Sequence, residues 1–295
     1  MSEPVSAHII CILPKLGAGI GGGKINAIFT RMNLLANKPG TVVTLLNLQH
    51  GCNQKIAFAD LTASGFLDPK IRHQSICEMC VPDPVKETNA PALPEWDDTK
   101  TTYGKKKRTT YLHKGVPVMR DSRDVTPAGE LITRQLLDHP KRDLRLKYLD
   151  GALIESREAF GDGIVDKVAY VNGQPRCRTR RENGALIEIE DVALGQTFAN
   201  EIAHHRALAL RHFPEDTIVF IDGVTSAYLS PSILARKVLF LHADHRNASG
   251  KIVPRSRGLI EAFDGDAIIT ATRVHKEQLD RDLDHKVPIH VIPHY

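Results

Sequence analysis

The sequence has no apolar run long enough to cross a membrane. Its hydrophobic stretches stay well short of the roughly 20 residues that span a bilayer, and its first residues do not combine a basic start with a long apolar segment. We therefore expect a cytoplasmic protein. At 295 residues, 42% of them hydrophobic, the chain is long enough for one large or two modest domains with a sizeable core.

Cysteine is scarce, and its spacing argues against a disulfide framework. The five cysteines are odd in number and scattered, at positions 11, 52, 77, 80 and 177. Cys77 and Cys80 form a single CxxC pair with His73 upstream, but no second pair follows at the spacing of a zinc site. We expect a helix face that carries thiols here, rather than a metal or redox centre.

Neither sign of charge is in strong excess. A net charge of +4 is too small to indicate a nucleic-acid partner. Two groups of basic residues stand out: a run from Lys105 to Arg108 in a polar, loop-like segment, and Arg176, Arg178 and Arg180 along a predicted strand. Alternate residues of a strand share a face, so the three arginines form either a solvated surface or a contact for a polyanion.

Glycine, by contrast, is concentrated between residues 17 and 23, directly before Lys24. A predicted strand, 8–13, precedes this run, and a predicted helix, 24–36, follows it. A glycine-rich turn lets the backbone approach a ligand, and the helix N-terminus adds free N–H groups and partial positive charge. The arrangement is typical of a phosphate cradle, and a tight turn without a ligand gives the same pattern.

Three phosphate-binding motifs fit this loop to different degrees. Its glycines satisfy the dinucleotide pattern, but the second predicted strand, 41–48, ends without the acid that this pattern requires. The P-loop requires Ser or Thr after its lysine to bind magnesium, and here Ile25 follows Lys24. A nucleotide triphosphatase is therefore disfavoured. The third motif is the glycine loop that lies under the diphosphate of a sugar nucleotide in glycosyltransferases.

The pattern of the sequence changes twice along the chain. Residues 1–85 and 195–295 alternate short apolar strands with helical patterns, which predicts a doubly wound, Rossmann-like parallel sheet of the α/β class. Between them, 110–192 carries Asp-Gly and Asn-Gly pairs flanked by short strands, a strong signal for β-hairpins. We predict an inserted antiparallel β-meander of about five strands, preceded by a linker or long loop over 81–107.

The ends of the predicted parallel strands define where a ligand would bind. Ligands of doubly wound sheets lie beyond the carboxyl ends of the strands, so the glycine loop, Asp222 and the segment from His242 to His245 are expected to converge. The predicted elements of the two α/β segments are strands 8–13, 41–48, 217–221, 237–242, 267–271 and 288–292 and helices 24–36, 53–66, 196–212, 230–236, 254–262 and 272–283.

His242 and His245 are the candidate site residues of the strand-end segment His-Ala-Asp-His. Neutral imidazole both donates and accepts hydrogen bonds, which suits contact with a polar ligand. The pair could instead bind a metal, although no third ligand is evident, or serve in capping and packing. His204 and His205, on a predicted helix, are expected at the surface.

Four features together resemble a known family. They are Leu13-Pro14 before Gly21-Gly22-Gly23-Lys24, the Asx-Gly meander, His242-Ala243-Asp244-His245, and the closing Val291-Ile292-Pro293-His294-Tyr295. The set is similar to the N-terminal, acceptor-side half of retaining GT-B glycosyltransferases. It most resembles the branch that glycosylates poly(glycerol-phosphate) or poly(ribitol-phosphate) teichoic acids, in which a β-rich domain is inserted into the acceptor-side Rossmann domain.

This resemblance implies a nucleotide sugar, a UDP-sugar, as donor substrate, with no separate cofactor and no metal. Gly21 and Gly22 would lie near the donor diphosphate, and Gly23 and Lys24 would open the helix beyond. His242 would contact the transferred sugar, and His245 would be its catalytic neighbour. The meander would bind a polyanionic polymer or a protein acceptor, or build a homo-oligomer.

The resemblance also assigns most donor contacts to a second Rossmann domain after the Ile-Pro linker, which here is Ile292-Pro293. The sequence ends at that linker, so we expect a fragment, a truncated product or one subunit of a split enzyme. Two functions stay open on this basis. One is hexosyl transfer completed by a separate C-terminal GT-B half, and the other is a non-catalytic, acceptor-binding or co-chaperone-like subunit.

Overall fold

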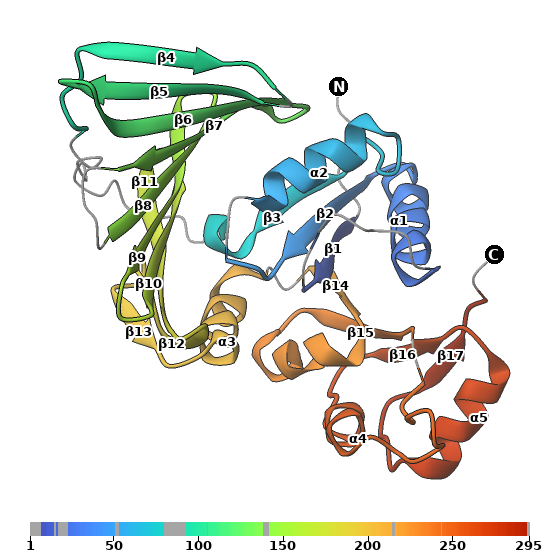
Figure 1. Cartoon of the computed structure of the whole chain (residues 1–295). Helices are drawn as coiled ribbons and strands as arrows, with labels where there is room; N and C mark the ends of the chain where they lie inside the picture. The colour runs from blue at the N-terminus through green and yellow to red at the C-terminus, as the bar shows by residue number, and fades with distance from the viewer. Residues whose placement is uncertain are drawn as a thin grey trace. The chain divides into compact units, whose positions relative to one another are not determined.

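The computed structural model describes residues 7–14, 16, 23–50, 53–79, 93–104, 106–137, 142–213, 216–242 and 244–293 (Figure 1). The chain divides into two compact units. The first comprises Met1–Gln49, Leu61–Ile76 and His205–Tyr295, and the second comprises His50–Asp60 and Cys77–His204. Within the described residues, no helix is both long and apolar enough to cross a membrane.

A seven-stranded sheet forms the first unit, and all its neighbouring strands are parallel. Its order is β17-β16-β15-β14-β1-β2-β3, so the chain builds the sheet outward in both directions from β1 and β14. This confirms the predicted doubly wound α/β fold. The strands are β1 (Ala7–Leu13), β2 (Thr41–Asn47), β3 (Arg72–Ser75), β14 (Thr217–Asp222), β15 (Arg236–Leu241), β16 (Ala267–Thr270) and β17 (Ile289–Val291).

The central strands of this sheet are apolar because both of their faces are covered. Ile12 of β1, Leu45 of β2, Ile221 of β14 and Leu239 of β15 are all fully buried. Near-continuous apolar runs of this kind are typical of parallel sheets and made these strands predictable. The edge strand β3 reads Arg-His-Gln-Ser and has no apolar residue, so the sequence pattern missed it.

Helices connect the parallel strands. Helix α1 packs against β2, and α5 packs against β16 and β17 (Figure 1). The Thr272 hydroxyl caps α5 by accepting a hydrogen bond from the backbone N–H of His275 at 3.1 Å. The helices are α1 (Gly23–Ala36), α2 (Asn53–Ala63), η1 (Ile76–Glu78), α3 (Glu201–His212), η2 (Val224–Ser232), α4 (Pro254–Glu261) and α5 (Arg273–Asp282), of which η1 and η2 are 3₁₀-helices.

Two helix predictions in the third part of the sequence were wrong in detail. Only the first three residues of the segment predicted as helix 230–236 are helical, because the 3₁₀-helix η2, which contains Pro231, ends at Ser232 and β15 begins at Arg236. The helix predicted from residue 196 begins at Glu201, because Gln196–Phe198 forms strand β13. Both errors lie at element boundaries, where tertiary pairing overrides local propensity.

The second unit is built on a ten-stranded antiparallel sheet in which each strand pairs with the next along the chain. The direction of the strands rotates strongly from β4 and β5 to β10 and β11 (Figure 1), as sheet twist requires. The strands are β4 (Asp98–Thr102), β5 (Lys107–His113), β6 (Val116–Thr126), β7 (Gly129–Leu136), β8 (Arg142–Leu149), β9 (Ala152–Phe160), β10 (Ile164–Val171), β11 (Gln174–Glu182), β12 (Ala185–Asp191) and β13 (Gln196–Phe198).

The meander is therefore twice as large as the about five strands predicted. Strand β4 falls inside the segment predicted as a linker, and Lys107 and Arg108 begin β5 rather than lying in a loop. All five residues of β4 are exposed, since the strand forms one edge of the sheet. An edge strand without an apolar side cannot be found from alternation, which explains the error.

The Asx-Gly pairs form hairpin turns as predicted. Asp150, Asn172 and Asn183 have φ of 48°, 53° and 48°, and the glycine after each also has positive φ. Two consecutive left-handed residues are the signature of a type I′ turn. The same turn joins β5 to β6, where Lys114 has φ of 51°. The sequence missed that hairpin because lysine is not a residue that signals a left-handed conformation.

Leucines and a methionine form a buried cluster in this sheet: Met119, Leu136, Leu144, Leu146 and Leu153. Asp121 is fully buried in the same strand as Met119. Arg134 donates two hydrogen bonds of 2.8 Å to its carboxylate, and the Tyr111 hydroxyl donates one of 3.0 Å. Charged hydrogen bonds of this kind allow a carboxylate to stay buried. Burial and the Asp121 charge raise the pKa of Tyr111.

Three predictions about polar residues were wrong or fall only partly within the described residues. His204 and His205 are 1% and 4% exposed, not surface residues. Cys77 lies in η1 and His73 in β3, so they do not share a helix face, and Cys80 lies outside the described residues. Arg176 is buried at a β-bulge between β10 and β11. The predicted row of three arginines therefore reduces to Arg178 and Arg180.

Candidate functional site

The candidate site lies at the carboxyl edge of the parallel sheet, where β1 and β14 are neighbours and the chain order reverses. In doubly wound folds, ligands bind beyond the carboxyl ends of the strands, at the point where the strand order reverses. Strand β1 ends at Leu13 before the glycine loop, β14 ends at Asp222, and His242 directly follows β15. Gly21 and Gly22 lie outside the described residues. Gly23 and Lys24 form the first residues of α1, as predicted.

Asp222 is the centre of a buried polar cluster at this edge, and its side chain is 0% exposed. Arg31 of α1 places its Nη2 2.6 Å from both carboxylate oxygens. His242 places its Nε2 2.8 Å from Oδ1 of the same carboxylate. Since a carboxylate oxygen only accepts hydrogen bonds, the His242 ring donates from Nε2 to Asp222.

Aromatic rings complete the surroundings of this cluster. The Arg31 guanidinium carbon lies 3.7 Å from the centre of the Phe240 ring and 5.5 Å from that of Phe220. The His242 ring also stacks on Phe240, with ring centres 6.1 Å apart and an angle of 16° between planes. Cation–π contact and stacking hold Arg31 and His242 in defined positions next to Asp222.

The thiol of Cys11 in β1 lies close enough to Asp222 and Arg31 for their charges to change its pKa. Burial first, and then the charge of Asp222, raise the pKa of the thiol to about 12, while Arg31 acts in the opposite direction. A thiol with this pKa is not a nucleophile at neutral pH. Besides this thiol, the polar side chains that the described residues bring together in this cluster are those of Arg31, Asp222 and His242.

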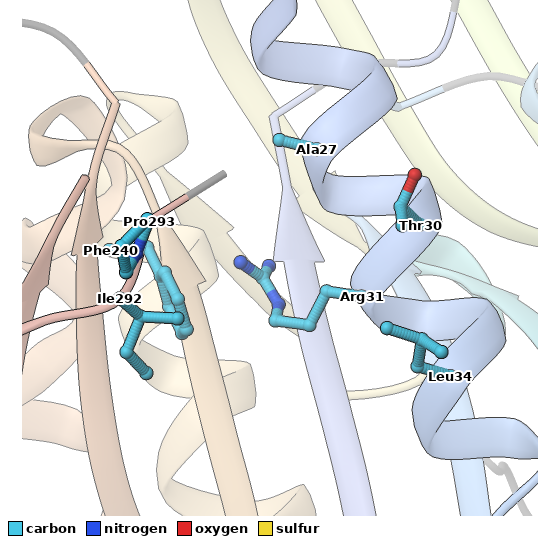
Figure 2. A pocket seen from close by; sticks show the side chains of 7 residues that line it. All are labelled: Ala27, Thr30, Arg31, Leu34, Phe240, Ile292 and Pro293. Carbon is cyan, nitrogen blue, oxygen red and sulfur yellow. The ribbon is translucent and has the colours of Figure 1, made fainter. Parts of the chain in front are cut away.

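A cavity of about 210 Å³ borders this cluster. Figure 2 shows Arg31 reaching from α1 toward Phe240 and Ile292 across it. Its lining is mainly apolar, with Ala27, Thr30 and Leu34 on the α1 side and Pro293 beyond β17. The cavity is smaller than the roughly 300–1,000 Å³ of common ligand pockets, so it suits part of a ligand.

His245 takes part in a different group of residues from His242. It is 2% exposed, and its Nε2 lies 2.8 Å from Oδ2 of Asp282, the last residue of α5. Arg246 donates to the same oxygen of Asp282, at 2.7 Å from Nε. His242, by contrast, bonds the carboxylate of Asp222. His245 therefore anchors the segment after β15 to α5.

The structure adds a third potential metal ligand that the sequence did not reveal. The ligand atoms of Asp244, His245 and His275 lie within 4.8 Å of one another. Burial lowers the pKa of His275, partly offset by Asp244, and so favours the neutral ring that metals bind. His275 sits on α5, some thirty residues after His245, and only the packing of α5 brings it close.

A second cavity, of about 370 Å³, lies on the antiparallel sheet. It is lined by three arginines, Arg142, Arg178 and Arg180, and by four acids, Glu158, Asp166, Glu188 and Glu190. Arg180 donates hydrogen bonds of 2.8 and 2.7 Å to Asp166, and Arg178 one of 3.1 Å to Glu190. The arginines are thus paired with acids, so this cavity does not form a basic face for a polyanion.

Comparison with known proteins identifies the fold. No family model matches the sequence, and no curated protein matches it either. Among solved structures, the crystal structure of TarM aligns over 98% of this chain with 14% identity and a TM-score of 0.73. The chain is similar in fold to TarM. A point mutant of TarM from S. aureus, in complex with fondaparinux, α-GlcNAc-glycerol and UDP, aligns over 98% with 14% identity and a TM-score of 0.70.

The alignment covers 61% of the TarM chain, so this sequence spans less than two thirds of TarM. TarM is a teichoic acid glycosyltransferase, the branch that the sequence motifs resemble. The chain also aligns with the Gap123 glycosylation-associated protein complex of Streptococcus agalactiae at 11% identity over 97% of its length, with a TM-score of 0.46. That score does not establish a shared fold.

Proposed function

We propose that this chain forms the acceptor-side Rossmann part of a glycosyltransferase, which transfers a sugar from a nucleotide sugar to a polymer or protein acceptor. The observation that carries the proposal is the fold similarity to TarM over 98% of the chain. A TarM variant was solved with UDP and α-GlcNAc-glycerol, which makes a UDP-sugar the first donor to test.

The glycine loop would face the donor diphosphate. The loop joins β1 to α1 at the reversal of strand order, and α1 begins at Gly23. Free backbone N–H groups and the dipole of α1 favour negative charge at that helix end. When the glycosidic bond breaks, charge grows on the leaving diphosphate, and donors placed there in advance lower the barrier. We assign this role to Gly21, Gly22 and Gly23, with Lys24 beside them.

His242 would contact the transferred sugar from the neighbouring strand end. Its hydrogen bond to Asp222 fixes the ring, and Arg31 in turn fixes Asp222. A ring held by its neighbours can orient a sugar hydroxyl without losing mobility on binding. Asp222 and Arg31 then act as positioning residues. His245 would contribute through the segment that it anchors to α5.

Donor affinity in this proposal comes largely from a second Rossmann domain, as the resemblance to GT-B enzymes implies. Isothermal titration of the chain with UDP-GlcNAc should therefore give weak binding. Product formation with a glycerol-phosphate polymer should need a C-terminal GT-B half, tested by combining this chain with candidate halves. Tight binding of UDP-GlcNAc by this chain alone, or no product from any such pair, would contradict the proposal.

One observation favours a second candidate, a non-catalytic acceptor-binding subunit. The His242 side chain is only 2% exposed, so a sugar reaches it only after neighbouring groups move. A binding subunit would retain acceptor affinity in the chain alone and would be unaffected by His242→Ala. Acceptor binding and turnover measured on the same samples separate the two candidates.

The meander would hold the acceptor or join two copies of the chain. Because the arginines of its cavity are paired with acids, we place polyanion binding outside that cavity. Within the part of the chain that the structure describes, no strand pairs with the outer edge of β4, and such an edge suits self-association. Light scattering of the whole chain should then show a dimer, and a Thr101→Pro variant in β4 should be monomeric. A monomer in both samples would exclude this route.

A further inference from the structure

Two histidines and a cysteine meet in the interior of the second unit. His50 follows β2 in the sequence, Cys177 lies in β11, and His204 lies in the first turn of α3. One ligand atom from each, a His50 nitrogen, Cys177 Sγ and a His204 nitrogen, lies within 4.8 Å of the others. Cys177 is 3% exposed and His204 1% exposed, and His50 is half-buried.

A buried carboxylate orients one of the histidines. Asp191, 1% exposed, places Oδ2 2.7 Å from Nε2 of His204. The register of β11 and β12 pairs Asp191 with Cys177, so the two residues are cross-strand neighbours. The other oxygen of Asp191 accepts a hydrogen bond of 2.9 Å from the backbone N–H of Leu194. Asp191 is therefore held by Leu194 while it accepts a hydrogen bond from the Nε2–H of His204.

This contact leaves the lone pair of His204 on Nδ1, which faces His50. His50 Nε2 lies 2.8 Å from His204 Nδ1, and the two rings are stacked with centres 5.0 Å apart. A histidine whose outer nitrogen donates to a carboxylate is the arrangement seen around metal ions, because the carboxylate fixes the tautomer and strengthens the ligand. Imidazole nitrogen and thiolate sulfur are the ligands that zinc prefers.

We propose that His50, Cys177 and His204 bind a zinc ion, with Asp191 as the residue that positions His204. The described residues supply three of the four ligands that tetrahedral zinc takes. Cysteine among the ligands favours zinc over magnesium or calcium, which take oxygen ligands. The burial of Cys177 and His204 makes this a structural site, which ties the residue after β2 to the sheet and to α3.

Binding of zinc requires a small movement of the histidine rings, the transfer of one proton within His50 and the loss of one proton from Cys177. Zinc–nitrogen bonds of about 2.0–2.1 Å place two ligand nitrogens roughly 3.3 Å apart, so the histidine rings separate by about half an ångström. The proton of His50 Nε2 moves to Nδ1, which keeps the ring neutral. The Cys177 thiol, whose long hydrogen bond reaches the Arg178 carbonyl at 4.0 Å, loses its proton to solvent. Binding thus releases one proton and becomes tighter as pH rises.

The whole chain, purified without chelator or affinity metal, is the sample for the test. Elemental analysis should find close to one zinc per chain. After removal of zinc, titration with Co²⁺ should produce the near-ultraviolet thiolate-to-cobalt band and the visible bands of tetrahedral cobalt. Neither measurement needs a variant, so a folding defect cannot obscure the result. Absence of zinc together with absence of the thiolate band would overturn the proposal.

Variants then assign the ligands. Cys177→Ser should lose the thiolate band, and His204→Ala should lose the metal. Cys77→Ser and His205→Ala are matched controls, since Cys77 is another buried thiol and His205 is the buried neighbour of His204, bonded to Tyr228 at 2.6 Å. Both controls should keep one metal and the same spectrum. The assignment would be refuted if Cys77→Ser lost the metal and Cys177→Ser did not. It would also be refuted if His205→Ala lost the metal and His204→Ala did not.

Asp191→Asn tests the positioning role. The asparagine oxygen can still accept from the backbone N–H of Leu194, but His204 Nε2 loses its charged acceptor, so Co²⁺ affinity should fall by about 10–100-fold while the spectrum stays that of a thiolate site. A changed spectrum at unchanged affinity would contradict the role of Asp191. The metal measurements do not depend on sugar transfer, so their outcome is independent of the glycosyltransferase proposal.

Discussion

Arg31 and Asp222, 191 positions apart in the sequence, form an ion pair in which one guanidinium nitrogen, Nη2, lies 2.6 Å from both carboxylate oxygens. The contact joins α1, which follows the glycine loop, to the end of β14. It also fixes the carboxylate that His242 bonds. One ion pair thus connects the proposed diphosphate cradle with the residue proposed to contact the sugar.

Removal of Arg31 should destabilise the protein strongly. Arg31→Met leaves Asp222, which is 0% exposed, without its cationic partner, and breaking a buried pair costs about 3 kcal/mol or more. Urea unfolding measures the change. The control Arg257→Ala removes a surface arginine that bonds Glu261 at 3.0 Å and should change stability by less than about 0.5 kcal/mol. Equal effects of the two substitutions would show that the Arg31 pair is not special.

Catalysis should depend on His242 once a complementary half is present. His242→Ala should lower the transfer rate by about 10²-fold, comparable to the loss of one preorganised polar contact. Gly22→Val, outside the described residues, should block the diphosphate. His285→Ala, whose ring bonds Asp280 at 3.0 Å, is the control and should keep full rate. An unimpaired His242→Ala enzyme would remove this histidine from the mechanism.

Stability should fall in alkali because of Cys11. Its pKa is raised from 9.0 to about 12 in the folded protein, so between these values only the unfolded chain loses the thiol proton. The contribution is fully present below pH 9 and is lost as pH rises toward 12, with a slope of roughly 1 kcal/mol per pH unit. Cys11→Ala should flatten this slope in urea unfolding at pH 8 to 10.5. A parallel pH dependence in both proteins would exclude Cys11 as its source.

Glu155 should stabilise the meander at neutral pH. It is 3% exposed, and Lys147 and Lys167 place their Nζ atoms 2.8 and 2.7 Å from it. Burial raises its pKa, but the two lysines outweigh this and hold the pKa below the usual value. Its contribution is therefore present above the usual pKa of glutamate and lost as pH falls through the lower folded value.

Glu155→Gln should cost about 2 kcal/mol at pH 7 and little in acid. Urea unfolding at pH 7 and at pH 3 measures both. Glu188→Gln, which removes an exposed acid of β12, is the matched control. A loss for Glu155→Gln that is the same at both pH values would contradict the ionic explanation.

Lys114→Asn should stabilise the hairpin between β5 and β6. Lys114 has φ of 51° and precedes Gly115 in a turn that favours Asn-Gly. Its backbone N–H donates to Asp97 at 2.9 Å, a bond that the substitution keeps. We expect a gain of roughly 0.5–1 kcal/mol in thermal unfolding. Lys107→Asn, in the extended β5, should give no gain, and an equal gain there would argue against the turn as the cause.

The sequence by itself determined the fold class, and it predicts a candidate site at the carboxyl ends of the parallel strands. Apolar strands such as β1 and β14 are continuous because both faces are buried, and the Asn-Gly turns need left-handed residues, so local pattern and structure agree there. The glycine loop, the end of β14 and His242 were expected at one edge because parallel strands share their carboxyl ends. The edge strands β3 and β4 were not predicted because few of their side chains are buried.

Tertiary structure alone decided which polar groups meet. No local sequence pattern around Arg31 predicts that its partner is Asp222. His245 bonds Asp282 rather than joining His242, because α5 packs beside it. His204, expected at the surface, is buried because Asp191 and His50 bond it in the interior. Hydrophobic periodicity reports which face of an element is covered. The partner of a buried polar side chain depends on which distant element does the covering, and that follows from the packing of the whole chain.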